Sequence, residues 1–176
     1  MRVRMQIASA NSKCKAKAKA NTKIKAQQIL EIQICYDIVR ENSQGVCPKQ
    51  IKGVAVSSIL VVDDDKSVLE VMSEMLRLEG HCVAVAENGV EAVDRVANHT
   101  FDLVITDLIM PEKEGLETIA EIRRNRADMP IVAISGGGRL GPNDYLETAR
   151  FIGANATLAK PFARRELLQT VDALLA

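Results

Sequence analysis

The sequence predicts an α/β fold in which a parallel five-stranded sheet is covered by helices on both faces. From Ser58 onward, five short apolar runs alternate with five segments of helical periodicity. Alternating strand–helix units of this length require right-handed crossovers and a parallel sheet. The predicted strands are almost continuously rich in Val and Ile, which is typical of strands buried on both faces. We therefore expect a doubly wound, three-layer α/β sandwich.

Each element is predicted from its own stretch of sequence. Uninterrupted apolar runs predict strands over Ile59–Val62, Cys82–Ala86, Leu103–Thr106, Ile131–Ile134 and Ala156–Ala159. The segments between and after them have helical spacing of apolar residues and predict helices over Ser67–Leu78, Gly89–Asn98, Glu114–Asn125, Pro142–Ile152 and Ala163–Leu175.

The first 53 residues differ in composition from the rest. Residues 1–53 have a net charge of +8 and residues 54–176 a net charge of −8. Asn11–Ala26 is a low-complexity stretch of Lys, Ala and Asn, for which we expect disorder. Leu30–Ile38 fits a strand or a helix, and Asn42–Gly53 has the glycine and proline content of a linker. We expect a poorly structured basic extension over 1–53 and one domain over 54–176.

Several classes of protein and site are disfavoured by composition. No apolar run approaches the roughly 20 residues that span a bilayer, and the basic start lacks the apolar core of a secretory signal. We expect no membrane association and a cytoplasmic location. The four cysteines form no CxxC pair and indicate neither a zinc site nor a disulfide framework, so a reducing setting is expected.

An acidic cluster follows two of the predicted strands. Asp63, Asp64 and Asp65 come directly after the first strand, and Asp107 comes directly after the third. Ligand sites in open α/β sheets lie at the carboxyl ends of the strands, so these carboxylates should meet. Converging carboxylates repel one another unless a cation intervenes, and oxygen ligands suit Mg²⁺ or Mn²⁺.

Two further polar residues end the remaining strands on that side of the fold. Ser135 follows the fourth strand and Lys160 the fifth. A metal, a hydroxyl and an ammonium in one pocket suit a phosphoryl group. Taken singly, Asp65 is best explained as a helix N-cap, Asp107 as a turn residue and Lys160 as a surface charge. Their joint placement at successive strand ends favours a site.

Four motifs resemble the response regulator receiver family of bacterial two-component systems. They are VVDDD (Val61–Asp65), DLIMPEKEG (Asp107–Gly115), ISG (Ile134–Gly136) and KPF (Lys160–Phe162). The resemblance covers about 120 residues. It implies the flavodoxin-like (βα)5 receiver fold and a phosphoacceptor signalling domain that catalyses only its own phosphorylation and dephosphorylation.

The resemblance also implies a role for each matched residue. Asp107 would be the phosphoacceptor, attacking the phosphorus of a phosphohistidine. Asp64 and Asp107 would bind Mg²⁺ directly, Asp63 would hold a metal-bound water, and the backbone carbonyl of Ile109 would supply another oxygen.

The switching residues follow from the same resemblance. Lys160, before a cis Lys160–Pro161 bond, would pair with a phosphoryl oxygen. Ser135 would donate a hydrogen bond to another oxygen after modification, and this movement would be the switch.

The sequence departs from the family pattern on the output side. Thr157 replaces the usual aromatic residue three positions before the lysine, and the glycine-rich segment GGGRLGPNDY (Gly136–Tyr145) lengthens the region between Ser135 and Lys160. We expect this segment to carry the conformational signal. Ile109 and Gly137 stand where relatives often have polar side chains, which predicts slow self-dephosphorylation.

The function expected is phosphorelay signalling by a stand-alone receiver. Its partners would be a histidine kinase or a histidine phosphotransfer protein and an unnamed target, with phosphorylation-dependent dimerisation as a further expectation and nucleic acid disfavoured. Alternatives stay open: a nucleic-acid-binding regulator that uses the basic arm Lys13–Lys25, a metal-dependent phosphatase for small molecules, and a gene start placed too early, with initiation at Val54 or Val56.

Overall fold

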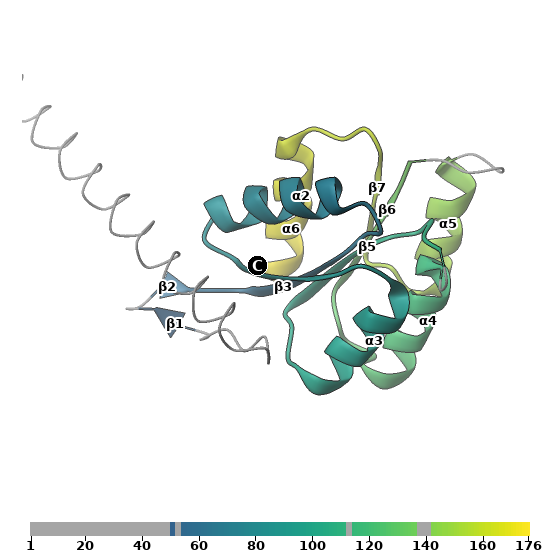
Figure 1. Cartoon of the computed structure of the whole chain (residues 1–176), viewed down its shortest axis with the longest axis horizontal. Coiled ribbons are helices and arrows are strands. Elements are labelled where there is room, and N and C mark those ends of the chain that lie inside the picture. The colour runs from purple at the N-terminus through teal and green to yellow at the C-terminus, as the bar shows by residue number, and fades with distance from the viewer. Residues whose placement is uncertain (1–49, 52–53, 112–113, 137–141) are drawn as a thin grey trace, which may run out of the picture.

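The computed structural model describes residues 50–51, 54–111, 114–136 and 142–176, and Figure 1 shows their arrangement. The main sheet contains five strands: β3 (Ser58–Val62), β4 (Cys82–Ala86), β5 (Leu103–Asp107), β6 (Ile131–Ser135) and β7 (Ala156–Ala159). The helices within the described residues are α2 (Lys66–Leu78), α3 (Gly89–Asn98), α4 (Gly115–Asn125), α5 (Pro142–Ile152) and α6 (Arg164–Leu175). Every predicted strand and helix of the domain is confirmed, with no end shifted by more than one residue.

The sheet is parallel throughout and has the strand order β4-β3-β5-β6-β7. The chain therefore runs from β3 outward to β4, returns to the other side of β3 as β5, and continues outward to β7. This reversal creates a topological switch point between β3 and β5, where open α/β sheets place their ligand crevice.

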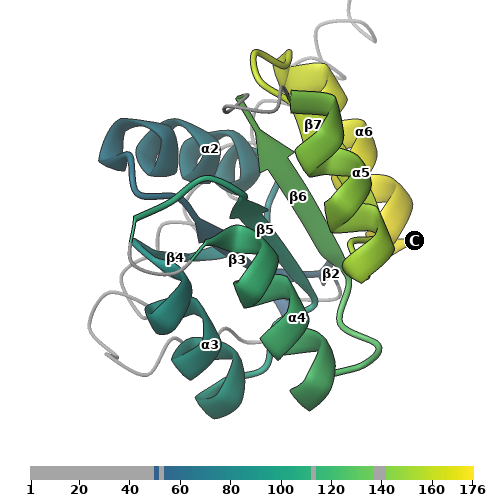
Figure 2. The same ribbon diagram turned by 90° about the vertical axis from the view of Figure 1, so that its right-hand side faces the viewer.

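Helices cover both faces of the sheet. Helices α2 and α6 lie on one face and α3, α4 and α5 on the other (Figures 1 and 2). Each face has its own apolar core, because alternate strand residues point to opposite faces. One core joins Val61 and Ile105 to Leu167 of α6, and the other joins Leu60 and Val104 to Ile119 of α4.

Burial differs between the inner strands and the edge strand β7. All residues of β3, β5 and β6 are buried, which explains their continuous apolar sequence. In β7 three residues are half-buried and Ala159 is exposed. The three-layer sandwich predicted from the sequence is thus confirmed, with both edges of the sheet less covered than its centre and β7 the less covered of the two.

Helix α2 shows how the sequence sets an element. Asp65 caps its N-terminus, because the Asp65 carboxylate accepts a hydrogen bond from the Ser67 N–H at 2.8 Å. The buried residues of the helix are Leu69, Met72, Ser73 and Leu76. Their spacing of three or four residues places them on one face, which packs on the sheet.

Arg123 joins α4 to the segment before β7, at the end of the sheet away from the carboxyl ends of the strands. Its Nε and one Nη donate to the Gly153 carbonyl at 2.8 Å and 2.7 Å. The other Nη donates to the carbonyls of Ala127 and Met129, and Asn155 is a further acceptor. One half-buried guanidinium therefore holds three chain segments together.

A short antiparallel pair precedes the main sheet. Strands β1 (Gln50–Ile51) and β2 (Val54–Ala55) pair with each other. The sequence predicts a linker over part of this region and no strand, because two-residue strands are too short to show an alternating pattern. The expectations for Asn11–Ala26 and Leu30–Ile38 lie outside the described residues, and the domain boundary at residue 54 stays a prediction. Within the described part of the chain, no helix has the length and apolarity required to cross a membrane.

Candidate functional site

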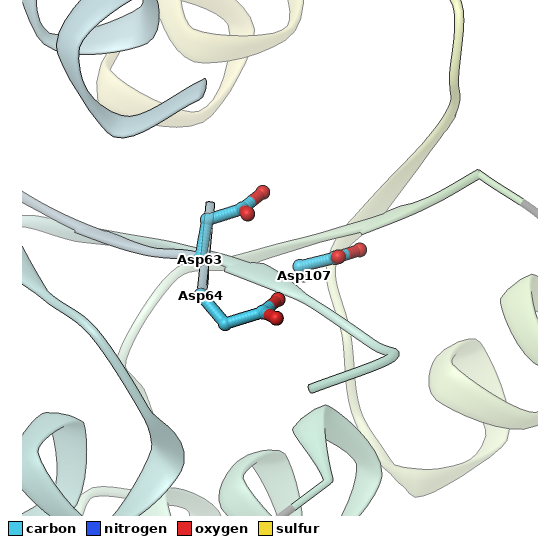
Figure 3. Close-up of side chains that lie close together, drawn as sticks. All are labelled: Asp63, Asp64 and Asp107. Carbon is cyan, nitrogen blue, oxygen red and sulfur yellow. The ribbon is translucent and has the colours of Figure 1, made fainter. Parts of the chain in front are cut away.

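Three carboxylates converge at the switch point of the sheet. Asp63 and Asp64 directly follow β3, and Asp107 ends the neighbouring strand β5. Carboxylate oxygens of the three residues lie within 4.8 Å of one another, and Figure 3 shows the side chains gathered at one place. Asp63 and Asp107 are buried, whereas Asp64 is exposed. The convergence predicted from the strand ends is therefore observed.

Lys160 places its ammonium between two of these carboxylates. Its Nζ lies 2.7 Å from Oδ2 of Asp63 and 3.2 Å from Oδ2 of Asp107. The Lys160 N–H donates to the Ser135 carbonyl at 2.8 Å, which anchors the residue beside the end of β6. The Lys160–Pro161 peptide bond is cis, as the resemblance implies.

Asp63 is held by the loop that leads into α2. The Asp65 N–H donates to Oδ1 of Asp63 at 2.9 Å, and the other carboxylate oxygen pairs with Lys160. Both oxygens of Asp63 thus have a defined partner. The cap role predicted for Asp65 is confirmed, but the sequence does not show that its own N–H orients the neighbouring carboxylate.

Asp107 is held by its own backbone. The N–H of Leu108 lies 2.9 Å from Oδ1 of Asp107 and 2.8 Å from the Ile134 carbonyl of β6. On the other side of the same peptide unit, the Thr106 hydroxyl donates to the Asp107 carbonyl at 2.9 Å. Sequence reasoning missed Thr106, because a threonine in a buried strand carries no signal that distinguishes a positioning role from packing.

The electrostatics of the site follow from burial and from the shared cation. Burial raises the pKa of Asp107, and the nearby Asp63 carboxylate raises it further, whereas Lys160 and the Leu108 N–H oppose this shift. Burial alone would lower the pKa of Lys160, but its contacts with Asp63 and Asp107 outweigh burial and raise the pKa. A buried carboxylate whose anion is disfavoured is stabilised as an anion by added positive charge.

The donor set fits a hard divalent cation. The three carboxylates offer oxygen ligands within 4.8 Å of one another, and oxygen is the ligand atom that Mg²⁺ prefers. The Lys160 ammonium already balances part of the negative charge of the three carboxylates. Mg²⁺ needs few protein ligands, so the negative charge that remains is compatible with it. The residues present therefore fit Mg²⁺ by their chemistry. The role of the Ile109 carbonyl as a further ligand stays a prediction.

Two further residues that the sequence singles out lie on β6 and β7. Ser135 ends β6 and is fully buried. The Thr157 hydroxyl accepts a hydrogen bond from Nε of Arg150 in α5 at 2.9 Å, so the position expected to hold an aromatic residue instead bonds to a helix. Gly137 lies outside the described residues, and so does the rest of the middle of the glycine-rich segment.

Comparison with known proteins identifies the class to which this fold and cluster belong. The model of the family "Response regulator receiver domain" matches residues 59–172. The chain is 39% identical over 117 residues to the response regulator MprA of a Mycobacterium species (strain KMS), a match that covers 66% of this chain and 50% of that protein. It is 38% identical over 125 residues to the "Transcriptional regulatory protein CpxR homolog" of Haemophilus influenzae, covering 68% and 51%.

Solved structures agree with these sequence matches. A CheY-like receiver domain from Methanospirillum hungatei superposes with a TM-score of 0.64 at 28% identity, covering 69% of this chain and 94% of that one. The response regulator TrrA from Thermotoga maritima, solved in complex with Mg(2+)-BeF, gives a TM-score of 0.60 at 34% identity, covering 68% and 99%.

The chain belongs to the response regulator receiver family, whose members are phosphoacceptor signalling domains of two-component systems. Receiver domains bind Mg²⁺ at an acidic pocket, and here the corresponding cluster is Asp63, Asp64 and Asp107. A receiver domain implies a histidine kinase as partner. The chain spans about half the length of the curated relatives that it matches.

Proposed function

We propose that this chain accepts a phosphoryl group on Asp107 from the phosphohistidine of a histidine kinase or of a phosphotransfer protein. An oxygen of the Asp107 carboxylate attacks phosphorus, the phosphorus–nitrogen bond breaks, and the imidazole leaves with its electron pair. The product is an acyl phosphate on Asp107. The observation that carries the proposal is the position of one Lys160 ammonium within 3.2 Å of both Asp63 and Asp107.

Each neighbouring residue has a task in this reaction. Asp63, Asp64 and Asp107 would hold Mg²⁺, which when bound supplies positive charge against the charge on the transferring oxygens. The Lys160 ammonium, now shared between two carboxylates, would pair with a phosphoryl oxygen. The buried Ser135 hydroxyl would donate to another oxygen once Asp107 is modified.

The test uses a small phosphodonor and the full chain. Incubation with acetyl phosphate and Mg²⁺ should add the mass of one phosphoryl group, as read by intact-mass spectrometry. Asp107→Asn should gain none, and chelation of Mg²⁺ should abolish the gain. A phosphoryl group that is retained in Asp107→Asn would refute the assignment of the phosphoacceptor.

The same preparation measures the lifetime of the acyl phosphate. Ile109 is partly exposed beside the site, and an apolar side chain cannot orient an attacking water. We therefore expect slow self-dephosphorylation, and replacement of Ile109 by Asn should shorten the lifetime. Decay within seconds in the unmodified protein would contradict this expectation.

A transcriptional regulator is the second candidate function. Two observations favour it: the printed name of one relative is a transcriptional regulatory protein, and residues 1–53 have a net charge of +8. In that function the Lys13–Lys25 arm would contact DNA phosphates while the receiver controls access. DNA binding that weakens steeply with salt and is lost when residues 1–53 are deleted would support it.

Phosphorylation-dependent dimerisation is a separate expectation. Sedimentation with and without acetyl phosphate tests it, and a dimer should form only with acetyl phosphate.

A further inference from the structure

We propose that Thr106 is a positioning residue for Asp107 and acts through the peptide unit that joins Asp107 to Leu108. This inference rests on the proposed function of Asp107 as the phosphoacceptor. It names a residue that touches neither the phosphoryl group nor the metal.

The carbonyl end of that peptide unit is held by the Thr106 side chain. Strand β3 ends at Val62, whose partner on β5 is Thr106, so Asp107 lies one residue beyond the β3–β5 register. On its other side Asp107 is still paired with Ile134 of β6. The Thr106 hydroxyl, itself fully buried, donates to the Asp107 carbonyl at 2.9 Å. The side chain thus supplies a donor where the neighbouring strand has ended.

The N–H end of the same peptide unit contacts two oxygens. The Leu108 N–H contacts the Ile134 carbonyl at 2.8 Å and Oδ1 of Asp107 at 2.9 Å. Because the peptide unit is planar, fixing its carbonyl also fixes the direction of its N–H. The N–H in turn fixes one carboxylate oxygen of Asp107, which leaves Oδ2 directed toward Lys160.

The hydrogen bond from Thr106 also polarises this peptide unit. A hydrogen bond to a carbonyl strengthens the hydrogen bond that the N–H of the same peptide unit donates. The Thr106 hydroxyl therefore both orients and strengthens the contact between the Leu108 N–H and the carboxylate. Valine has nearly the shape of threonine but cannot donate, so Thr106→Val removes this effect with little change in volume.

A matched control lies on α4. Thr118 is also fully buried, and its hydroxyl also donates to a backbone carbonyl, that of Glu114, at 3.1 Å. Thr118→Val removes a comparable hydrogen bond, but one that is not linked to the Asp107–Leu108 peptide unit. Thr106→Ser keeps the hydroxyl and should restore the behaviour of the unmodified protein.

The experiment compares these variants in two measurements. With acetyl phosphate and saturating Mg²⁺, the maximal phosphorylation rate of Thr106→Val should fall about three- to tenfold, the value of one net hydrogen bond. In ¹H–¹⁵N spectra of the metal-free protein, the Leu108 amide proton should shift upfield in Thr106→Val and stay in place in Thr118→Val and Thr106→Ser. Urea unfolding of all variants identifies any loss of rate that follows stability alone.

The outcomes separate the two proposals. An unmodified protein that gains no phosphoryl group would overturn the proposed function and the role of Thr106 with it. Phosphorylation of Thr106→Val at the rate of the unmodified protein, or an equal loss in Thr118→Val, would overturn the role of Thr106 alone. An unchanged Leu108 amide in Thr106→Val would also overturn it.

Discussion

The inner strands and the edge strand of the sheet contribute to the same site in different ways. Strands β3, β5 and β6 are buried along their whole length, and the carboxylates and Ser135 lie at or directly after their carboxyl ends. Strand β7 is only partly buried, and Lys160 follows it. The inner strands hold the carboxylates, which we call the fixed half of the site. The Lys160 ammonium and Thr157 belong to the less buried β7 edge, which we call the edge half. Such regions are the ones most easily displaced.

The largest expected effect breaks the fixed half of the site. An added Cβ at Gly115 would lie 2.0 Å from the Asp107 carbonyl oxygen and 2.6 Å from the Leu108 Cα, and neither backbone atom can move without displacing β5. We expect Gly115→Ala to destabilise the protein by about 3 kcal/mol and to abolish phosphorylation. Urea unfolding and the acetyl phosphate assay measure both effects.

Gly80→Ala is the control for this variant. Gly80 has a φ of +93°, but an added Cβ meets nothing within 4 Å. Its cost should be only the backbone strain of about 1 kcal/mol, with phosphorylation retained. Equal losses of stability in the two variants would contradict the expectation that the Asp107 carbonyl leaves no room for a side chain at position 115.

The second prediction concerns the charge of the fixed half. Burial raises the pKa of Asp107 above its ordinary value of 3.8, so the folded protein holds this proton more tightly than the unfolded chain. The stability of the metal-free protein should therefore fall as the pH rises from this value through the raised folded-state pKa. Asp107→Asn should remove that part of the decrease and should be the more stable protein at neutral pH.

Urea unfolding midpoints between about pH 4 and pH 8, measured in chelator, test this prediction. The difference between the unmodified protein and Asp107→Asn isolates Asp107, because the other groups titrate in both. A difference that does not change with pH would contradict the assignment of the raised pKa to this residue.

The third prediction concerns the edge half of the site, where α5 contacts β7. The hydrogen bond from Arg150 to Thr157 joins α5 to β7 at the surface, where such bonds contribute little. Thr157→Val should lower the stability by less than about 1 kcal/mol and should increase amide hydrogen exchange in β7 more than in β5. Arg150→Met should have the same effect, and Arg165→Met, at an exposed position on α6, should have none. Uniform exchange changes across the sheet would remove the distinction between its two halves.

The smallest expected effect stabilises the protein. The Ser73 hydroxyl on α2 is buried and has no hydrogen-bond partner among the described residues. A buried hydroxyl without a partner is costly, so Ser73→Ala should raise the unfolding free energy by about 0.5 kcal/mol. Ser67→Ala, at an exposed position of the same helix, controls for helix propensity. A loss of stability in Ser73→Ala would indicate a partner that forms in solution.

The fold was predictable because its determinants are local or topological. Apolar runs such as Leu103–Thr106 mark strands buried on both faces, and parallel topology brings strand ends to one edge. The meeting of Asp63, Asp64 and Asp107 followed from those two rules. The matched motifs added the role of Lys160, since nothing in its spacing alone distinguishes it from a surface charge.

The remaining contacts were not predictable because they depend on which way a side chain or peptide unit points. The Thr106 hydroxyl, the Asp65 N–H and the Arg150–Thr157 bond arise from the three-dimensional register of loops and helices. Residues of these types occur throughout the sequence without such contacts. The pair β1 and β2 was missed for a different reason, since two residues are too few to show a period.

The Arg123 contacts have a mechanical consequence for any movement of α5. Arg123 ties Gly153, which directly follows α5, to α4, so the C-terminal end of α5 is a pivot. A helix of 11 residues is about 16 Å long, and displacement grows with distance from a pivot. A small rotation there would move the Pro142 end of α5, which follows the strand β6 that ends at Ser135, the farthest. The contacts of Arg123 thus set which end of helix α5 moves least and which end moves most.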